Sequence, residues 1–456
     1  MTSSEQEKAS IIAVLTAMAL VVLDAGLLTV ALPSLAQSLD VTPSGAILAV
    51  SFYQGALVVG LLPSAHLAER LGYRRLFVGG LTVFSLASLL CAIAPSLPWL
   101  VAARVVQGFG GGAIMALGIA LLRFALGHGR LGSAIAWNAL TVALCAAAAP
   151  ILGASILSVA PWPWLFLAKL PLCLLALAAA RGLPRVEPIR GPIDRSAILL
   201  HGASAALIVA AASSLPDRPV AAALFAIAAV ASAGVLIKRE RSGEAPLWPI
   251  DLLALRPFRV AAVASICCFA GQSAGLLGLA FYLHLGSGND PLTAGLVLAC
   301  WPLSVAIAAP LASRLAERFG SAALCASGGA ILGIGLVLCA LWPVPAEIAP
   351  LAVGAALAGL GFGLFQVPNN RTLFMTAPLA RSAAAGGLQG SARLIGQTVG
   401  SLVTALLFAC IADVAAPRAG LALAACFATM AAGVSALELP TRSRPARGGA
   451  QAPAGN

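Results

Sequence analysis

The chain has 456 residues, of which 60% are hydrophobic and only 9% charged, and its formal net charge is +11. A soluble domain is typically about 25% charged, so this composition excludes a soluble globular protein and indicates a chain that lies mostly in lipid. The apolar runs are continuous and about 20 residues long, whereas the strands of a membrane β-barrel alternate over about 10 residues, so we predict membrane-spanning helices.

The apolar runs, taken in chain order, predict an all-α integral membrane protein with fourteen transmembrane helices. The linkers between the runs are short, so no soluble domain is expected, and residues 441–456 are predicted to form a disordered cytoplasmic tail. The predicted spans are residues 10–32, 46–65, 76–94, 98–122, 131–155, 162–180, 196–214, 219–237, 258–285, 292–312, 322–342, 347–368, 383–410 and 414–437.

The basic residues indicate how these spans are oriented. The chain has 27 Lys and Arg residues, of which three lie within the spans. If the N-terminus is cytoplasmic, 22 of the other 24 fall in cytoplasmic loops, and only Arg218 and Arg418 fall on the outer side. Cytoplasmic loops of membrane proteins carry such an excess of Lys and Arg. We therefore place both termini in the cytoplasm. Topology and contact with anionic lipid explain the positive charge, and nucleic acid is not needed.

The first span contains one acidic residue, Asp24. A charged side chain at mid-bilayer costs at least about 2.5–3.5 kcal/mol, so it usually faces a cavity or a partner. Arg104 in the fourth span and Lys169 in the sixth lie, like Asp24, roughly 10 Å from the outer ends of their helices, at about 1.5 Å per residue. We predict that the carboxylate of Asp24 binds and releases a proton and that the nearby cation Arg104 tunes its pKa. The alternative is a permanent structural ion pair between the two residues.

Lys169 admits three interpretations: a second partner of Asp24, a contact to an anionic substrate, or a side chain that snorkels to the outer interface. Arg393, about halfway along the thirteenth span, either lines the cavity and takes part in coupling or donates to backbone carbonyls of a neighbouring helix. Because the spans hold one acid against three bases, we expect a neutral, zwitterionic or anionic substrate.

Uncharged polar residues within the spans are further candidates for the transport path; they are Gln54, Gln107, Asn138 and Gln272. The segment FQVPNNRT (365–372) is either a broken-helix site or a cytoplasmic helix end. The ten cysteines fall almost entirely in apolar runs and are interpreted as small hydrophobic residues, because no metal-ligand spacing or disulfide framework is evident.

A short motif occurs twice, as LAERLG at 67–72 after the second span and as LAERFG at 315–320 after the tenth. The repeat divides the chain into two related six-helix bundles, residues 1–185 and 246–440, with an inserted helix pair at 186–245. The glycine allows a tight turn, and the charged residues either form a latch between the halves or only anchor the loops. The latch candidates are Glu69, Arg70, Gly72, Arg74, Arg75, Glu317, Arg318 and Gly320.

Several of these stretches together resemble the major facilitator superfamily, in particular its fourteen-helix branch of drug:proton antiporters. AHLAERLGYRR (65–75) is similar to the family's helix 2–3 loop motif, and LVAARVVQGFGGG (100–112) to its helix 4 motif. SARLIGQTVG (391–400) is similar to a late Arg-Gly motif of the branch. The resemblance covers nearly the whole chain.

Three other motifs keep some of the branch's residues and depart at others. LDAGLLTVALP (23–33) has Gly26 and Thr29 where Thr and Asn are usual, and WPWLFLAKLP (162–171) has Lys169 where an Asn is typical. AAAAPILGA (146–154) is similar to the antiporter motif of helix 5. It keeps Pro150 and Gly153 and has Ala149 and Ala154 at positions where Gly is usual.

The resemblance implies a proton-coupled exporter of small organic molecules that works by alternating access between two bundles; an importer or facilitator of the same fold is the alternative. No nucleophile–base or metal-ligand arrangement suggests an enzyme. We expect no cofactor, with the proton gradient as energy source. The expected partners are a small-molecule substrate, protons and membrane lipid, without nucleic acid. We expect a monomer in the bacterial cytoplasmic membrane.

Overall fold

The computed structural model describes residues 3–126, 131–187, 195–214, 218–242, 250–286, 290–343, 348–378, 381–411 and 415–439. Within these ranges every regular element is a helix. The predicted C-terminal tail lies outside the described residues. The helices are α1 Ser3–Ser38, α2 Pro43–Leu71, α3 Tyr73–Ala92, α4 Leu97–Leu126, α5 Leu131–Val159, α6 Trp164–Leu167, α7 Leu170–Ala179, η2 Ala180–Gly182, α8 Arg195–Ser214, α9 Pro219–Ser242, α10 Ile250–Ala254, α11 Arg256–Gly286, α12 Pro291–Phe319, α13 Ser321–Leu341, α14 Ala349–Thr376, α15 Ser382–Cys410 and α16 Ala416–Ala436.

The described helices agree with the predicted number of spans. Thirteen segments are long and apolar enough to cross a membrane, with α6, α7 and η2 together forming one of them, Trp164–Gly182. The remaining predicted span is α8, whose apolar stretch Ser196–Ala211 is shorter. Helices suit this environment because they satisfy every backbone polar group internally, where no water is present to do so. The protein is therefore a multi-pass, all-helical membrane protein.

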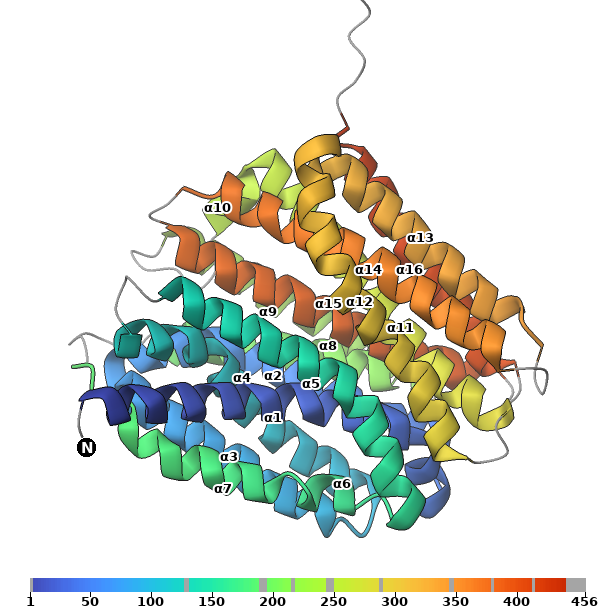
Figure 1. The fold of residues 1–456 in the computed structure, drawn as a ribbon, viewed down its shortest axis with the longest axis horizontal. Helices are drawn as coiled ribbons and strands as arrows, with labels where there is room; N and C mark the ends of the chain where they lie inside the picture. Colours follow the sequence, from blue (N-terminus) through green and yellow to red (C-terminus); the bar gives the residue numbers. More distant parts are fainter. Residues whose placement is uncertain are drawn as a thin grey trace, which may run out of the picture.

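The helices form two groups. α1–α7 pack on one another, as do α11–α16, and Figure 1 shows the first group in blue to green and the second in yellow to red. The groups meet where α2 packs on α15 and α5 packs on α12, while α8 and α9 pack on each other and α8 also touches α2 and α15. This grouping agrees with two bundles and an inserted pair; the bounds at residues 185 and 245 stay predictions.

The repeated motif has the same backbone geometry in both groups. Gly72 joins α2 to α3 with a φ of 97°, and Gly320 joins α12 to α13 with a φ of 82°. Each glycine donates its amide to the carbonyl four residues earlier, Gly72 to Ala68 at 2.9 Å and Gly320 to Ala316 at 3.1 Å. Side chains with a Cβ strain such a backbone, so the glycine of the motif is required at both turns.

Below, the end of the bundle at which α1 begins is called the inner end, and the end at which α1 stops is called the outer end. One helix crossing positions the site that follows. α2 and α4 approach so closely at Gly108 that a Cβ there would lie 2.5 Å from the carbonyl oxygen of Tyr53. Small residues permit such close crossings between membrane helices. The crossing brings the ring of Tyr53 in α2 over Arg104, one turn before Gly108 in α4.

Candidate functional site

A carboxylate with two cations lies inside the N-terminal group. Asp24 of α1 is 1% exposed, Arg104 of α4 is fully buried, and Lys169 is 3% exposed. The guanidinium nitrogen Nη1 of Arg104 donates to Oδ2 of Asp24, and the ammonium of Lys169 donates to Oδ1. Gln107 also donates to Oδ1, at 3.1 Å. Asp24, Arg104, Gln107 and Lys169 are called the charge cluster below.

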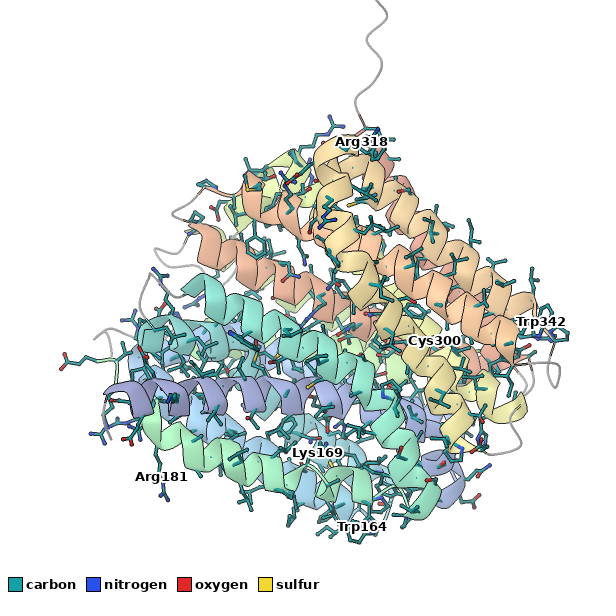
Figure 2. The ribbon with its side chains drawn as sticks, in the orientation of Figure 1. Trp164, Lys169, Arg181, Cys300, Arg318 and Trp342 are labelled. Carbon is teal, nitrogen blue, oxygen red and sulfur yellow. The ribbon has the colours of Figure 1, made fainter. Side chains whose placement is uncertain are left out.

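Lys169 reaches the charge cluster because its helix is interrupted. It lies between α6 and α7, flanked by Pro163 and Pro171, and the chain makes a turn there before α7 begins at Leu170. Figure 2 shows Lys169 between Trp164, towards the outer end, and Arg181, towards the inner end. The interpretation of Lys169 as a second partner of Asp24 therefore holds in this structure, and snorkelling does not.

A second layer fixes the charge cluster. Gln107 accepts from Nη1 of Arg104 at 2.5 Å and donates to the hydroxyl of Ser88 at 2.8 Å. Nε of Arg104 donates to the backbone carbonyl of Ala49 at 3.3 Å, and its guanidinium carbon lies 3.9 Å from the centre of the Tyr53 ring. Such hydrogen-bonded and cation–π contacts orient the buried guanidinium. Gln107 thus belongs to this cluster, and its place on the transport path stays a prediction.

The charge cluster carries more positive than negative charge. An Arg side chain keeps its proton in proteins, whereas a Lys or an Asp can exchange one when its surroundings change. One carboxylate between two cations can thus hold or release a proton when one contact opens. The arrangement is suited to couple protonation to a movement of α1 against α4 or α7.

The other predicted polar residues lie elsewhere. Gln54 of α2 accepts from the hydroxyl of Ser401 of α15 at 3.2 Å, so it joins the two groups. Gln272 of α11 accepts from Gln397 of α15 at 3.5 Å. The carbonyl oxygen of the half-buried Asn138 side chain, in α5, has no partner among the described residues. Arg393 lies in α15, on the far side of the interface from the charge cluster.

The predicted latch residues lie at the inner ends of the helices. Arg75, Glu317 and Arg318 are exposed, and Figure 2 shows Arg318 at the end of the C-terminal group opposite Trp342. Glu69, Arg70 and Arg74 are half-buried beside the turn at Gly72. Their role as a latch stays a prediction. The FQVPNNRT segment is neither a break nor an end, because α14 continues through Pro368 to Thr376.

The two alanines of the helix 5 motif face glycines. A Cβ on Gly26 of α1 would lie 2.4 Å from the Cβ of Ala149, and a Cβ on Gly295 of α12 would lie 2.3 Å from the Cβ of Ala154. Pro150 is buried within α5, and Gly153 packs against Leu27 of α1. α5 thus still packs closely on α1 and α12, because a glycine on the facing helix leaves room for the methyl group of each alanine.

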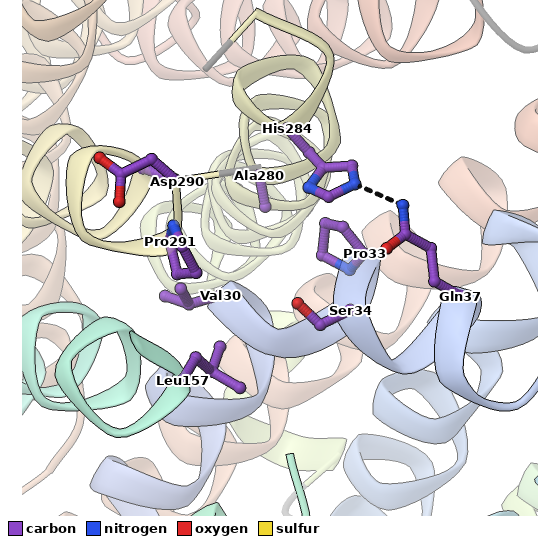
Figure 3. Close-up of a pocket in the computed structure, with 10 residues that line it drawn as sticks. Val30, Pro33, Ser34, Gln37, Leu157, Ala280, His284, Asp290 and Pro291 are labelled. Carbon is purple, nitrogen blue, oxygen red and sulfur yellow. Dashed lines mark hydrogen bonds between the residues drawn. The ribbon is translucent and has the colours of Figure 1, made fainter. Parts of the chain in front are cut away.

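The outer ends of the two groups are in contact. Gln37 of α1 and His284 of α11 form a hydrogen bond of 3.0 Å beside a pocket of about 260 Å³, which Figure 3 shows. Neither residue stands out in the sequence, because each lies near a helix end, where polar residues are common. Only their cross-bundle contact distinguishes them. The structure thus has the two groups joined at the outer end.

The fold and the repeated motif define a membrane transporter of two helical bundles. The sequence profile of the Major Facilitator Superfamily matches residues 14–287, and the chain belongs to this family. The family consists of transporters, so this protein is a transporter of small solutes.

Individual relatives agree with this assignment. The chain is 38% identical to the uncharacterized transporter YebQ of Escherichia coli (strain K12) over 445 residues, 95% of this chain and 96% of the relative. It is 29% identical to the multidrug efflux pump LfrA of Mycolicibacterium smegmatis, over 85% of this chain and 78% of that protein. The crystal structure of a POT family transporter in complex with 5-aminolevulinic acid superposes with a TM-score of 0.72 at 14% identity, covering 93% of this chain and 94% of that one, which shows the shared fold.

Proposed function

We propose that the protein is a proton-coupled secondary transporter that exports small organic molecules across the bacterial cytoplasmic membrane. The observation that carries the proposal is the charge cluster, in which the buried carboxylate of Asp24 binds both Arg104 and Lys169. When a carboxylate and an ammonium are in contact, each favours the charged form of the other. If the contact is made in one conformation and broken in the other, a proton can be bound in one and released in the other.

Export is favoured over import by two observations. Several relatives are named as exporters, among them the multidrug efflux pump LfrA and a tetracenomycin C resistance and export protein of Streptomyces glaucescens. The segment of α5 that contains Pro150 and Gly153 also keeps its tight packing on α1 despite the neighbouring alanines. Both support an antiporter in which substrate and proton move in opposite directions.

The test uses the purified full-length chain in liposomes that contain a pH-sensitive dye. The test compounds are first chosen by comparing a deletion strain with its parent. The comparison measures susceptibility to a broad panel of compounds and the export of metabolites. In an antiporter, a transported compound that enters the vesicles is exchanged for internal protons. Its addition outside vesicles with a pH gradient, acidic inside, should therefore raise the internal pH and collapse the gradient. An unchanged gradient would indicate a uniporter, and proton movement along with the compound would indicate a symporter.

The matched variants are Asp24→Asn, within the charge cluster, and Asp251→Asn, whose carboxylate pairs with Arg381 at the protein surface. Proton coupling should be lost in the first and kept in the second. Proton-coupled transport by Asp24→Asn at the rate of the unmodified protein would contradict the proposed role of the cluster.

A further inference from the structure

One face of α15 carries a row of polar side chains. Gln389, Arg393 and Gln397 follow one another at intervals of four residues, so they lie on the same side of the helix. All three are half-buried, whereas their neighbours Ala392, Leu394 and Thr398 are buried. Gln389, Arg393 and Gln397 are called the α15 stripe below.

Open space lies beside the α15 stripe at Gly390. Gly390 lies one turn from Arg393 on the same side of the helix, and a Cβ built on it would meet no atom within 4 Å. Leu394 packs with the core of the N-terminal group, and Gly396 packs against Ile266 and Phe269 of α11. The stripe therefore lies between the side of α15 that faces α11 and the side that faces α2.

Amides from two neighbouring helices flank Arg393. Gln389 donates to the side-chain oxygen of Asn370 of α14 at 3.1 Å, and Gln397 donates to that of Gln272 of α11 at 3.5 Å. Because Asn370 and Gln272 accept through their oxygens, their amide nitrogens remain available as donors. The stripe thus presents a cation with hydrogen-bond donors on both sides.

Arg393 has no counter-charge in the described part of the chain. Its Nε is buried without a hydrogen-bond partner, and the ion pairs of the described residues involve other groups. Arg393 is 11 residues after the start of α15 at Ser382, which is roughly 16 Å along a helix. A lone guanidinium at that depth is costly and in membrane proteins marks a ligand path or a missing partner. Arg104, by contrast, already has its carboxylate.

We propose that the α15 stripe is the part of the transport path that binds the substrate, and that the substrate carries a carboxylate. A guanidinium binds a carboxylate through two parallel hydrogen bonds, and flanking amides can donate to the same oxygens or to a polar group beside them. The proposal rests on the proposed function and names its substrate class.

The test measures ligand binding to the full chain in detergent, where no proton gradient exists. The probes are benzoate, octanoate and indole-3-acetate, each paired with its primary amide, and the readout is the rise in Tm with probe concentration. At least one acid should bind roughly 10- to 100-fold more tightly than its amide, as expected for a hydrogen-bonded charge. If no acid in the three pairs binds more tightly than its amide, the proposal is wrong.

Variants then assign the binding to Arg393. Arg393→Gln should remove the preference for the acid, and Arg393→Lys should keep part of it because the charge remains. Arg381→Gln, the same change at the inner end of α15 where Arg381 pairs with Asp251, is the matched control and should bind like the unmodified protein. Unchanged acid binding by Arg393→Gln would overturn the proposal.

The binding test and the liposome test fail independently. Acid binding that depends on Arg393 without proton-coupled export would retain the site and remove the antiport mechanism. If instead the protein exports compounds without an acid group in exchange for protons, and Arg393→Gln has no effect, the antiport mechanism stands and the proposed carboxylate site is wrong.

Discussion

Lys169 and Asp24 are in direct contact, and the ammonium of Lys169 binds the carboxylate oxygen that Arg104 does not. The contact links the turn between α6 and α7 to the middle of α1. Lys169, which stands where the similar motif of the family has an Asn, thus adds a second cation to the buried carboxylate of Asp24.

The two cations should make the stability of Asp24 variants depend on Lys169. Asp24→Asn leaves two buried cations without an anion, which should lower the free energy of unfolding by about 3–5 kcal/mol. Lys169→Met in the same chain removes one of these charges and should restore part of the loss. Tm values of the two single variants and the double variant measure the coupling. Additive effects of the two substitutions would contradict the contact.

Tyr53 should contribute its ring and not its hydroxyl. The ring lies over the Arg104 guanidinium, while the phenol oxygen is buried with no hydrogen-bond partner among the described residues. Tyr53→Phe should therefore leave Tm unchanged or raise it, since an unsatisfied buried polar group costs about 1–3 kcal/mol. Tyr53→Ala should cost about 3–5 kcal/mol, as for other large core truncations. A marked loss in the Phe variant would indicate a role for the hydroxyl.

Gly26 and Ala149 should compensate each other. Gly26→Ala places a methyl group 2.4 Å from the Cβ of Ala149 and should cost about 1–3 kcal/mol by overpacking. Adding Ala149→Gly removes the clash, so the double variant should be more stable than Gly26→Ala alone. The coupling free energy from thermal unfolding should fall in the range of roughly 0.5–3 kcal/mol found for contacting residues.

Gly295→Val should open the outer end. A Cβ there would clash with Ala154 and with the Pro150 carbonyl oxygen, at 2.3 and 2.7 Å, so the valine disfavours the joined outer ends. A cysteine placed at Ser34, which lines the outer pocket, should react faster with a membrane-impermeant maleimide in this variant. The background lacks the ten native cysteines. Gly433→Val, where a Cβ meets nothing within 4 Å, serves as control and should leave the rate unchanged.

Asp290 should stabilise α12 at all pH values near neutrality. Its carboxylate accepts from the Thr293 hydroxyl and from the amides of Leu292 and Thr293, and these hydrogen bonds lower the pKa of Asp290. A lowered folded-state pKa means that the stabilisation is complete above the usual Asp value of about 3.9 and is lost only as the pH falls through the lower folded value.

The Tm difference between the unmodified protein and Asp290→Ala should therefore be constant between about pH 5 and pH 8. Asp290→Asn retains a side-chain acceptor at the helix start and should lose less stability than the Ala variant. A Tm difference that changes across this range would contradict the assignment.

Sequence alone determined the class and the outline of this protein. Apolar runs of spanning length, the one-sided distribution of Arg and Lys, and the repeated Gly-containing turn depend on local composition. They required no knowledge of packing. Burial of Asp24, Arg104 and Lys169 at similar depth was also predictable, since depth along a helix follows from residue count.

Tertiary structure decided which side chains meet. Helix rotation and crossing cannot be obtained from depth, so only the folded chain shows that Asp24 binds both cations, that Gln107 joins them, and that Gly26 faces Ala149. The same holds for Arg393, whose two sequence interpretations differ only in what surrounds it. Contacts between residues far apart in the chain depend on how whole helices pack, and that information is not local.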